Sequence, residues 1–331
     1  MRIAIDAMGG DHAPQAIVEG AVMAAKEWKD IEIVLVGDSV QIAAFMKEKP
    51  SNITIHHTDD VIEAEDEPVK AVRRKKNASM VVAGRLVKEK QADAMISAGN
   101  SGALMATGLL IVGRIEGIER PAFAPMVPTI QGTGHGVLCL DLGANMDASA
   151  ENLQQYAIMG SVYRKTVDGI ANPRVGLLNV GVETIKGNEL VRAAFPLLAE
   201  APVNFIGNVE ALDVLNGKCD ILVCDGFVGN IMLKSLEGAI SVIFAELRTE
   251  LSRNFLSKMA GLILKPGLRR LKRKADSSEY GGAAMLGVDG LVIKCHGASN
   301  ATAVKSSVRL ARHALKNQLV QAISTEISNG K

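Results

Sequence analysis

Aromatic residues are scarce in this chain: Phe, Tyr and Trp together make up 3% of its 331 residues. Small residues are plentiful instead, with 32 Gly, which favours close packing of helices on a sheet over an aromatic-rich β-sandwich. Net charge is also small, because 37 Lys and Arg nearly balance 36 Asp and Glu to leave +1. This balance does not indicate a basic footprint over the whole surface, so we expect no nucleic-acid partner.

Cysteine is rare, and none of the four cysteines belongs to a C-x-x-C pair. Each stands in or beside an apolar run, which predicts buried free thiols in a reducing cytosol. These residues are Cys139, Cys219, Cys224 and Cys295. A secretory signal peptide is not indicated, because Asp6, Asp11 and Glu19 stand where it would need an apolar core. We therefore expect a cytoplasmic protein.

Several common motifs are missing. The sequence has neither G-x-G-x-x-G after a strand nor G-x-x-x-x-G-K-[ST], so both common nucleotide fingerprints are absent. It has no G-x-S-x-G elbow, which disfavours a serine hydrolase. No H-E-x-x-H motif or paired Cys/His spacing marks a zinc site.

Short apolar runs rich in Val and Ile alternate with segments of helical spacing. The predicted strands are Arg2–Asp6, Glu32–Val36, Ile53–His56, Ala94–Ser97, Gly136–Leu140, Val175–Val180, Val203–Ile206, Asp220–Cys224 and Leu291–Cys295. The predicted helices include Ala13–Trp28, Ser79–Lys88, Glu151–Tyr163 and Asn300–Leu315. This alternation predicts a doubly wound α/β sandwich with a mostly parallel sheet, and we assign residues 1–331 to one large domain.

The stretch Ala94–Gly113 carries no charge and is long enough to cross a bilayer. However, its first half contains glycines and the polar residues Ser97, Asn100 and Ser101, which would be costly in lipid. We interpret it as the end of a strand, a loop and a buried helix.

Glycine-rich polar clusters recur just after the predicted strands: "IDAMGGDH", "SAGNSG", "DLGAN", "VGVETIKGN", "IGN", "CDGFVGN" and "CHGASN". Because ligands of open parallel sheets bind beyond the carboxyl ends of the strands, these loops are expected to converge on one crevice. A plainer interpretation stays open, in which the glycines form ordinary turns and several polar residues are helix N-caps. The candidate N-caps are Asp11, Ser101, Asn188, Asp225 and Ser299.

The clusters point to anion binding without a nucleotide motif. Glycines at Gly99–Gly102 allow a close backbone approach, and the following helix would offer free N–H groups and about +0.5 charge at its N-terminus. Lys186 lies in a glycine-bounded loop and would add a full positive charge, although a lone loop lysine is usually only solvated. Asn230 carries an amide able to position an anion or polarise a carbonyl.

The segments "MRIAIDAMGGDHAP", "SAGNSGA", "DLGAN", "IKGN", "DGFVGN" and "HGASN" resemble, in the same order, the PlsX family of bacterial acyl-ACP:phosphate acyltransferases. The resemblance implies a three-layer α/β sandwich like that of phosphotransacetylase and isopropylmalate dehydrogenase, assembled as a homodimer. It implies acyl transfer from acyl carrier protein to inorganic phosphate, without an organic cofactor or a metal. The product would be an acyl phosphate, the donor for a downstream glycerol-3-phosphate acyltransferase in phospholipid synthesis.

That chemistry predicts roles for individual residues. Gly99, Asn100, Ser101 and Gly102 would cradle phosphate, and Lys186 and Asn230 would meet the charge that develops on the carbonyl oxygen. His296 is a candidate proton donor to the leaving thiolate, with a purely structural role equally open. The polar residues expected to orient the loops are Asp6, Asp11, Asp141, Asn145, Asn188 and Asp225.

The stretch Arg253–Lys274 is basic and apolar without an acidic residue. We expect a protruding helical segment over residues 235–280, with a turn of the chain at Pro266-Gly267. Three interpretations compete: a hairpin on an anionic membrane surface, a dock for acyl carrier protein, or packing within a dimer. The predicted contact residues are Phe255, Met259, Leu262, Ile263, Arg269, Arg270, Lys272 and Arg273.

Two alternative functions stay open. One is a phosphotransacetylase that uses acyl-CoA, because the reacting thioester is the same. The other is a membrane-associated scaffold without catalysis, against which the concentration of polar loops at strand ends argues.

Overall fold

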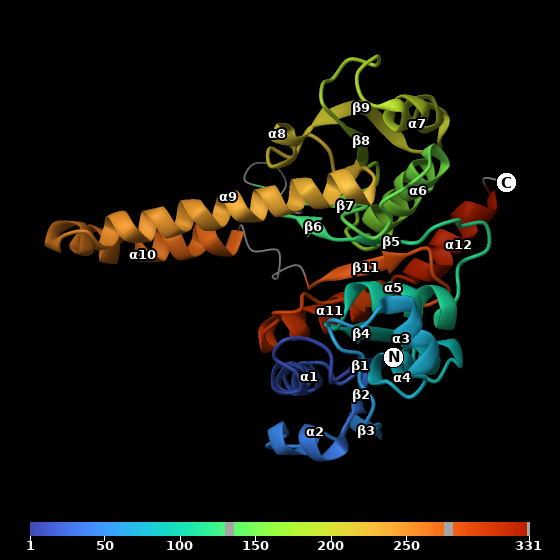
Figure 1. Ribbon diagram of the computed structural model, residues 1–331, viewed down its shortest axis with the longest axis vertical. Coiled ribbons are helices and arrows are strands. Elements are labelled where there is room, and N and C mark those ends of the chain that lie inside the picture. Colours follow the sequence, from blue (N-terminus) through green and yellow to red (C-terminus); the bar gives the residue numbers. More distant parts are fainter. Residues whose placement is uncertain (130–135, 275–280, 330–331) are drawn as a thin grey trace.

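The computed structural model describes residues 1–129, 136–274 and 281–329, and the side chains of 272–274 lie outside this description. Its strands form two sheets (Figure 1). The first has the order β3-β2-β1-β4-β12-β11-β5 and the second the order β6-β7-β10-β8-β9. The first sheet contains β1 (Arg2–Asp6), β2 (Glu32–Gly37), β3 (Ile53–His57), β4 (Ala94–Ser97), β5 (Ala122–Ala124), β11 (Ala283–Leu286) and β12 (Leu291–Lys294). The second contains β6 (Met126–Val127), β7 (Val137–Leu140), β8 (Arg174–Asn179), β9 (Asn204–Glu210) and β10 (Ile221–Val223).

The strands predicted from apolar runs are all present, with ends shifted by at most a few residues. They pair in parallel with one another, as expected for strands that are apolar on both faces. The prediction missed β5, β6 and β11, whose pairings are antiparallel. Their sequences "AFA", "MV" and "AAML" are short and carry little Val or Ile, so only the neighbouring strands reveal them.

Helices cover the faces of both sheets. They are α1 (Gln15–Glu27), α2 (Ser39–Phe45), α3 (Pro68–Arg74), α4 (Ser79–Lys88), α5 (Ser101–Thr107), α6 (Ala150–Thr166), α7 (Glu189–Glu200), α8 (Ala211–Val214), α11 (Ala301–Lys316) and α12 (Leu319–Asn329). A π-helical turn, η1 (Gly108–Val112), continues α5. Small residues permit the close packing expected from the composition: a methyl group on Gly20 of α1 would lie 2.6 Å from the carbonyl oxygen of Ala301 on α11.

One apolar core runs through both sheets. The same buried cluster contains Ile3 and Ile5 of β1 and Leu138 and Leu140 of β7. A second cluster covers the other face of the first sheet and includes Met95 of β4 and Leu104 of α5. The stretch from Ala94 therefore forms a strand, a loop and a largely buried helix, which confirms that interpretation.

Two helices, α9 (Gly226–Ser252) and α10 (Phe255–Lys274), lie side by side and project away from the sheets (Figure 1). The predicted turn at Pro266-Gly267 is wrong, because Pro266 lies inside α10. The chain turns instead at Asn254, whose side-chain oxygen accepts a hydrogen bond from the backbone N–H of Ser257 at 2.8 Å. The proline is tolerated because the carbonyl it leaves unpaired belongs to exposed Leu262, where water can bind it. Residues 275–280 of the predicted segment lie outside the described residues.

Candidate active site

The end of β1 is tied to the end of β4 through a buried carboxylate. Asp6 accepts hydrogen bonds of 2.6 Å from the hydroxyl groups of Ser79 and Ser97, and a weaker one from the backbone N–H of Met8. The Ser97 hydroxyl in turn accepts from the backbone N–H of Gly99 at 3.0 Å. Burial raises the pKa of Asp6, against the lowering effect of these hydrogen bonds. Asp6 thus holds the beginning of the Gly99 loop.

Three loops of the first sheet meet at the ends of β1, β4 and β12. A methyl group on Gly9 would lie 2.8 Å from the backbone nitrogen of Gly99, so the first two loops touch through their backbones. The backbone N–H of Asp11 donates to the carbonyl of Gly297 at 2.9 Å, which joins the first loop to the third. The predicted capping role of Asp11 is wrong, because α1 has Pro14 at its N-cap.

The loop that begins at Gly99 ends in the N-terminus of α5. Asn100 is the N-cap: its side-chain oxygen accepts from Ala103 N–H at 3.0 Å, and its amide nitrogen donates to the carbonyl of Ala64 at 3.0 Å. Ser101, which was predicted to be the cap, is the first helical residue. Ser101 and Gly102 are exposed, and a helix leaves its first N–H groups without intrahelical partners. The backbone of these two residues is thus available to an anion, while the Asn100 side chain is already committed to the loop.

His296 is exposed at the end of β12. Its Nδ1 accepts a hydrogen bond of 3.2 Å from the backbone N–H of Ala298, so that nitrogen is used within the loop and Nε2 is the atom left to face a substrate. The cap of α11 is Asn300 and not Ser299, which corrects the predicted cap.

A second group of loops follows β7 and β10. Asp141 is buried and accepts from the backbone N–H groups of Ala144 and Asn145, the latter at 2.6 Å. Burial raises the pKa of Asp141, while these bonds act in the opposite direction. Asp225 is the N-cap of α9 and accepts from Phe227 and Val228, as one of the predicted caps.

Asn230 on the first turns of α9 packs against the loop after β7. A methyl group on Gly143 would lie 3.3 Å from the Cγ of Asn230, and the backbone N–H of Gly226 donates to the carbonyl of Asn145 at 2.9 Å. Asn230 is half-buried beside a loop that the Asp141 carboxylate holds in shape. This is the setting of a rigidly positioned hydrogen-bond donor.

Lys186 stands in the loop after β8 and is exposed. Two side-chain amides that were not predicted as site residues hold this loop: Asn179 donates to the carbonyl of Lys186 at 3.1 Å and Asn208 to that of Glu183 at 2.9 Å. Asn188 caps α7 through Val191 N–H, as predicted.

The loops do not form a single row along one sheet. "IDAMGGDH", "SAGNSG" and "CHGASN" follow strands of the first sheet, whereas "DLGAN", "VGVETIKGN" and "CDGFVGN" follow strands of the second. The segment "IGN" lies inside β9, so its prediction as a strand-end loop is wrong. Its Gly207 has φ of +91° at an irregular register between β8 and β9, which explains the glycine without a ligand.

Contacts between the two groups come from the loop after β7. Asn145 donates from its amide to the carbonyl of Pro121, next to β5 of the first sheet, at 2.8 Å. Ala144 packs against the core cluster that contains Leu104 of α5. The loop after β7, against which Asn230 packs, therefore lies beside the face of the first sheet that α5 covers.

The four cysteines are buried and free, as the apolar runs around them predicted. Burial raises the pKa of every one of these thiols, to about 12 for Cys219 and about 11 for Cys295. None of them is therefore suited to act as a thiolate nucleophile.

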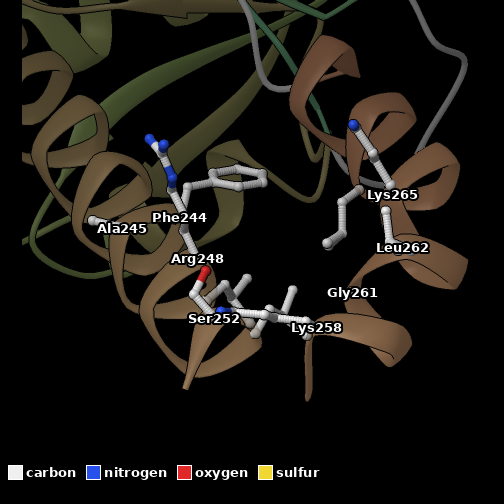
Figure 2. A pocket seen from close by; sticks show the side chains of 11 residues that line it. Phe244, Ala245, Arg248, Ser252, Lys258, Gly261, Leu262 and Lys265 are labelled. Carbon is white, nitrogen blue, oxygen red and sulfur yellow. The ribbon is translucent and has the colours of Figure 1, made fainter. Parts of the chain in front are cut away.

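The hairpin of α9 and α10 encloses a groove of about 850 Å³ that is apolar with a basic margin. Figure 2 shows Phe244 and Arg248 of α9 on one side and Leu262 and Lys265 of α10 on the other. Of the predicted contact residues on α10, Phe255 is 76% exposed and Ile263 78% exposed. Met259, Leu262, Arg269 and Arg270 are exposed as well, whereas the side chains of Lys272 and Arg273 lie outside the described residues. By length and composition α9 would also suffice to cross a membrane, although one such helix is weak evidence for a span.

Residues 1–322 match the family described as "Fatty acid synthesis protein". Proteins named "Phosphate acyltransferase" from Bacillus thuringiensis (strain Al Hakam) and Bacillus cereus (strain AH187) are each 54% identical to this chain over 325 residues. That match covers 98% of this chain and 98% of each relative. The relationship confirms the resemblance drawn from the glycine-rich segments.

Solved phosphotransacetylases share the fold. The enzyme from Streptococcus pyogenes superposes with a TM-score of 0.62 at 17% identity, covering 96% of this chain and 94% of that chain. A branched-chain phosphotransacylase from Enterococcus faecalis V583 gives a TM-score of 0.56 at 15% identity, covering 95% and 98%. At such identities the likeness shows the fold alone, and it confirms the predicted α/β sandwich.

Proposed function

This chain belongs to the PlsX family of phosphate acyltransferases, and from that premise we propose that it transfers a fatty acyl group from acyl carrier protein to inorganic phosphate. Acyl transfer to phosphate is the activity of the family. The carrier-protein donor and a place in phospholipid synthesis, upstream of a glycerol-3-phosphate acyltransferase, are the finer parts of the proposal. The full-length relationship to phosphate acyltransferases carries it.

Phosphate is proposed to bind at the N-terminus of α5. Exposed Ser101 and Gly102 offer backbone N–H groups, and the helix adds its partial positive charge. The missing side chain of Gly9 lets its backbone approach that of Gly99, and Asn100 supports the cradle by capping the helix and hydrogen-bonding the carbonyl of Ala64. Phosphate is already an oxyanion at neutral pH, so the cradle needs only to hold it at about 3–3.5 Å from the thioester carbon.

The reaction then needs donors for the carbonyl oxygen. A phosphate oxygen forms a bond to the thioester carbon, and the carbonyl oxygen takes up negative charge in the tetrahedral intermediate. The amide of Asn230 and the ammonium of Lys186 are proposed to stabilise that charge. The C–S bond then breaks and its electron pair leaves on the carrier sulfur, and a proton from His296 Nε2 can neutralise the thiolate. A simple thiol has a pKa near 8.5, so this last assistance is modest.

The protruding hairpin is proposed to place the enzyme on an anionic membrane surface. Exposed Phe255, Leu262 and Ile263 would each contribute about 1.5–3 kcal/mol when buried in lipid, and each basic residue near the surface about 1 kcal/mol. A few of each suffice for reversible binding. The same basic surface suits a strongly acidic carrier protein, so a dock for the acyl donor is the second candidate for this hairpin.

A homodimer is also part of the proposal. α9 exposes Val242 at 62% and Ile243 at 58%, so a second copy of the chain would remove apolar surface from water. Light scattering coupled to size exclusion measures this directly. A mass of one chain at micromolar concentration would contradict the dimer without affecting the proposed chemistry.

The deciding experiment is phosphate-dependent release of free carrier thiol from acyl-ACP by the purified protein. Acyl-CoA replaces acyl-ACP in a parallel reaction, and omission of phosphate is the blank. Release from acyl-ACP but not from acyl-CoA supports the proposal. Preference for acyl-CoA would make the protein a phosphotransacetylase, and release from neither would favour the scaffold.

A further inference from the structure

Lys294 ends β12 on the face of the first sheet that carries α5. Along this strand Leu291 and Ile293 belong to the core cluster shared by both sheets, whereas Val292 belongs to the cluster beneath α5. Because side chains alternate along a strand, Lys294 points to the same face as Val292. Ala4 of β1 and Met95 of β4 belong to the same cluster as Val292. Asp6 and Ser97 stand two residues after them, so their side chains point to that face as well.

Asp6, Ser97 and Lys294 form one row across neighbouring strands. Lys294 is in direct register with Ser97, and β4 pairs in turn with β1. Ser97 is the residue that binds both Asp6 and the backbone of Gly99. Lys294 therefore stands one strand away from the group that holds the proposed phosphate loop.

The ammonium of Lys294 has no carboxylate partner among the residues that the structure describes: neither an ion pair nor a side-chain hydrogen bond engages it. The residue is only partly exposed, and desolvation lowers the pKa of Lys294. An incompletely hydrated cation without a counter-ion is costly, and an anionic ligand would offset that cost.

Apart from the neighbouring thiol of Cys295, the groups that act electrostatically on Lys294 lie on α9. Glu237 favours the charged form of Lys294, and Lys234 disfavours it. Asn230, Lys234 and Glu237 are spaced i, i+4 and i+7, so they lie on one face of α9. Lys294 thus faces the side of α9 on which Asn230 stands, one turn before Lys234. With two lysines against one glutamate, this part of the site carries a net positive charge.

We propose that the Lys294 ammonium binds the inorganic phosphate that accepts the acyl group, opposite the backbone N–H groups of Ser101 and Gly102. This inference rests on the proposed function and adds to it a residue that contacts the substrate. The lysine neutralises part of the phosphate charge and fixes its orientation, and a remaining phosphate oxygen attacks the thioester. The acyl donor needs no contact with Lys294.

The test compares Lys294→Met, which keeps an unbranched side chain without the charge, with Lys294→Arg, which keeps the charge. We expect Lys294→Met to raise KM for phosphate about tenfold or more and to leave KM for the acyl donor within about twofold. Lys294→Arg should recover most of the affinity for phosphate. The matched control is Lys305→Met, which removes a partly exposed lysine paired with Glu27 on α1, a helix on the opposite face of the first sheet. If Lys294 had a purely structural role, its replacement would change KM for phosphate and KM for the acyl donor alike.

Calorimetric titration with inorganic phosphate alone separates this inference from the proposed function. The wild type should bind phosphate, and Lys294→Met should bind it at least about tenfold more weakly. Equal binding by both proteins overturns the role of Lys294 even if acyl transfer is observed. A wild type that binds phosphate but releases no carrier thiol overturns the proposed function and not the phosphate site. If Lys294→Met does not fold, as judged by circular dichroism, Lys294→Gln takes its place, with the same expected loss.

Discussion

The hydroxyl of Ser97 donates a hydrogen bond of 2.6 Å to the carboxylate of Asp6, across 91 positions of the chain. The same hydroxyl accepts from the backbone N–H of Gly99, so one serine connects the end of β1 to the proposed phosphate loop. The loop is therefore held in shape by a carboxylate that is buried beneath it.

The burial of Asp6 makes stability depend on pH. Its folded pKa lies above the value of 3.8 expected in the unfolded chain, so the folded protein binds this proton more tightly. The contribution of Asp6 to the free energy of unfolding is therefore fully present below its unfolded pKa, and it is lost as the pH rises through its folded pKa. We expect the unfolding free energy of wild type relative to Asp6→Asn to be greater at about pH 4 than at about pH 7, as measured by urea unfolding. A difference that grows with pH would contradict the assignment.

Gly9→Ala should damage the site, because the new methyl group would lie 2.8 Å from the backbone nitrogen of Gly99 and 2.5 Å from a carboxylate oxygen of Asp6. We expect a loss of about 1–3 kcal/mol in unfolding free energy together with weaker phosphate binding. Gly238→Ala is the control, because nothing lies within 4 Å of its added methyl group and the glycine is inside α9. That variant should gain stability, by up to about 1 kcal/mol.

Asn230→Ala should lower kcat about 10²–10³-fold if its amide stabilises the carbonyl oxygen in the transition state. Lys186→Ala should lower kcat in the same direction, and both are measured by thiol release from acyl-ACP. Asn188→Ala, two residues from Lys186, removes the N-cap of α7 and no proposed donor to the carbonyl oxygen. It should cost about 1 kcal/mol of stability and lower kcat much less than either of the other two substitutions. Near-normal turnover in both Asn230→Ala and Lys186→Ala would remove these residues from the mechanism.

Leu262→Glu should abolish co-sedimentation with vesicles that contain anionic lipid, because it places a charge on the exposed apolar surface of α10. Binding by the wild type should weaken with salt and in vesicles of neutral lipid. Leu212→Glu, at a 70% exposed position of α8 outside the hairpin, should sediment like the wild type. Unchanged sedimentation of Leu262→Glu would leave carrier-protein docking as the role of the hairpin.

The sequence by itself determined the parallel strands, the principal helices and the family. A fully buried strand such as Ile33–Val36 can be predicted from its own apolar residues. The glycine-rich segments together indicate the family because they occur in a constant order, although each segment alone is weak evidence. Asn100 and Asn230 were singled out because each stands beside a glycine shortly after a predicted strand, whereas the capping of α5 by Asn100 is visible only in the structure.

Only the tertiary structure decided how the strands divide between two sheets and what each polar side chain contacts. β11 has no strong signal of its own and exists because β5 and β12 pair with it on either side. Pro266 predicted a turn, yet an exposed helix can leave the carbonyl before it to water. Lys294 stands near the end of a predicted apolar strand, and its partial burial without an ion-pair partner becomes visible only in the folded chain. Local residue pattern specifies conformation, whereas burial and charge depend on neighbours that are distant along the chain.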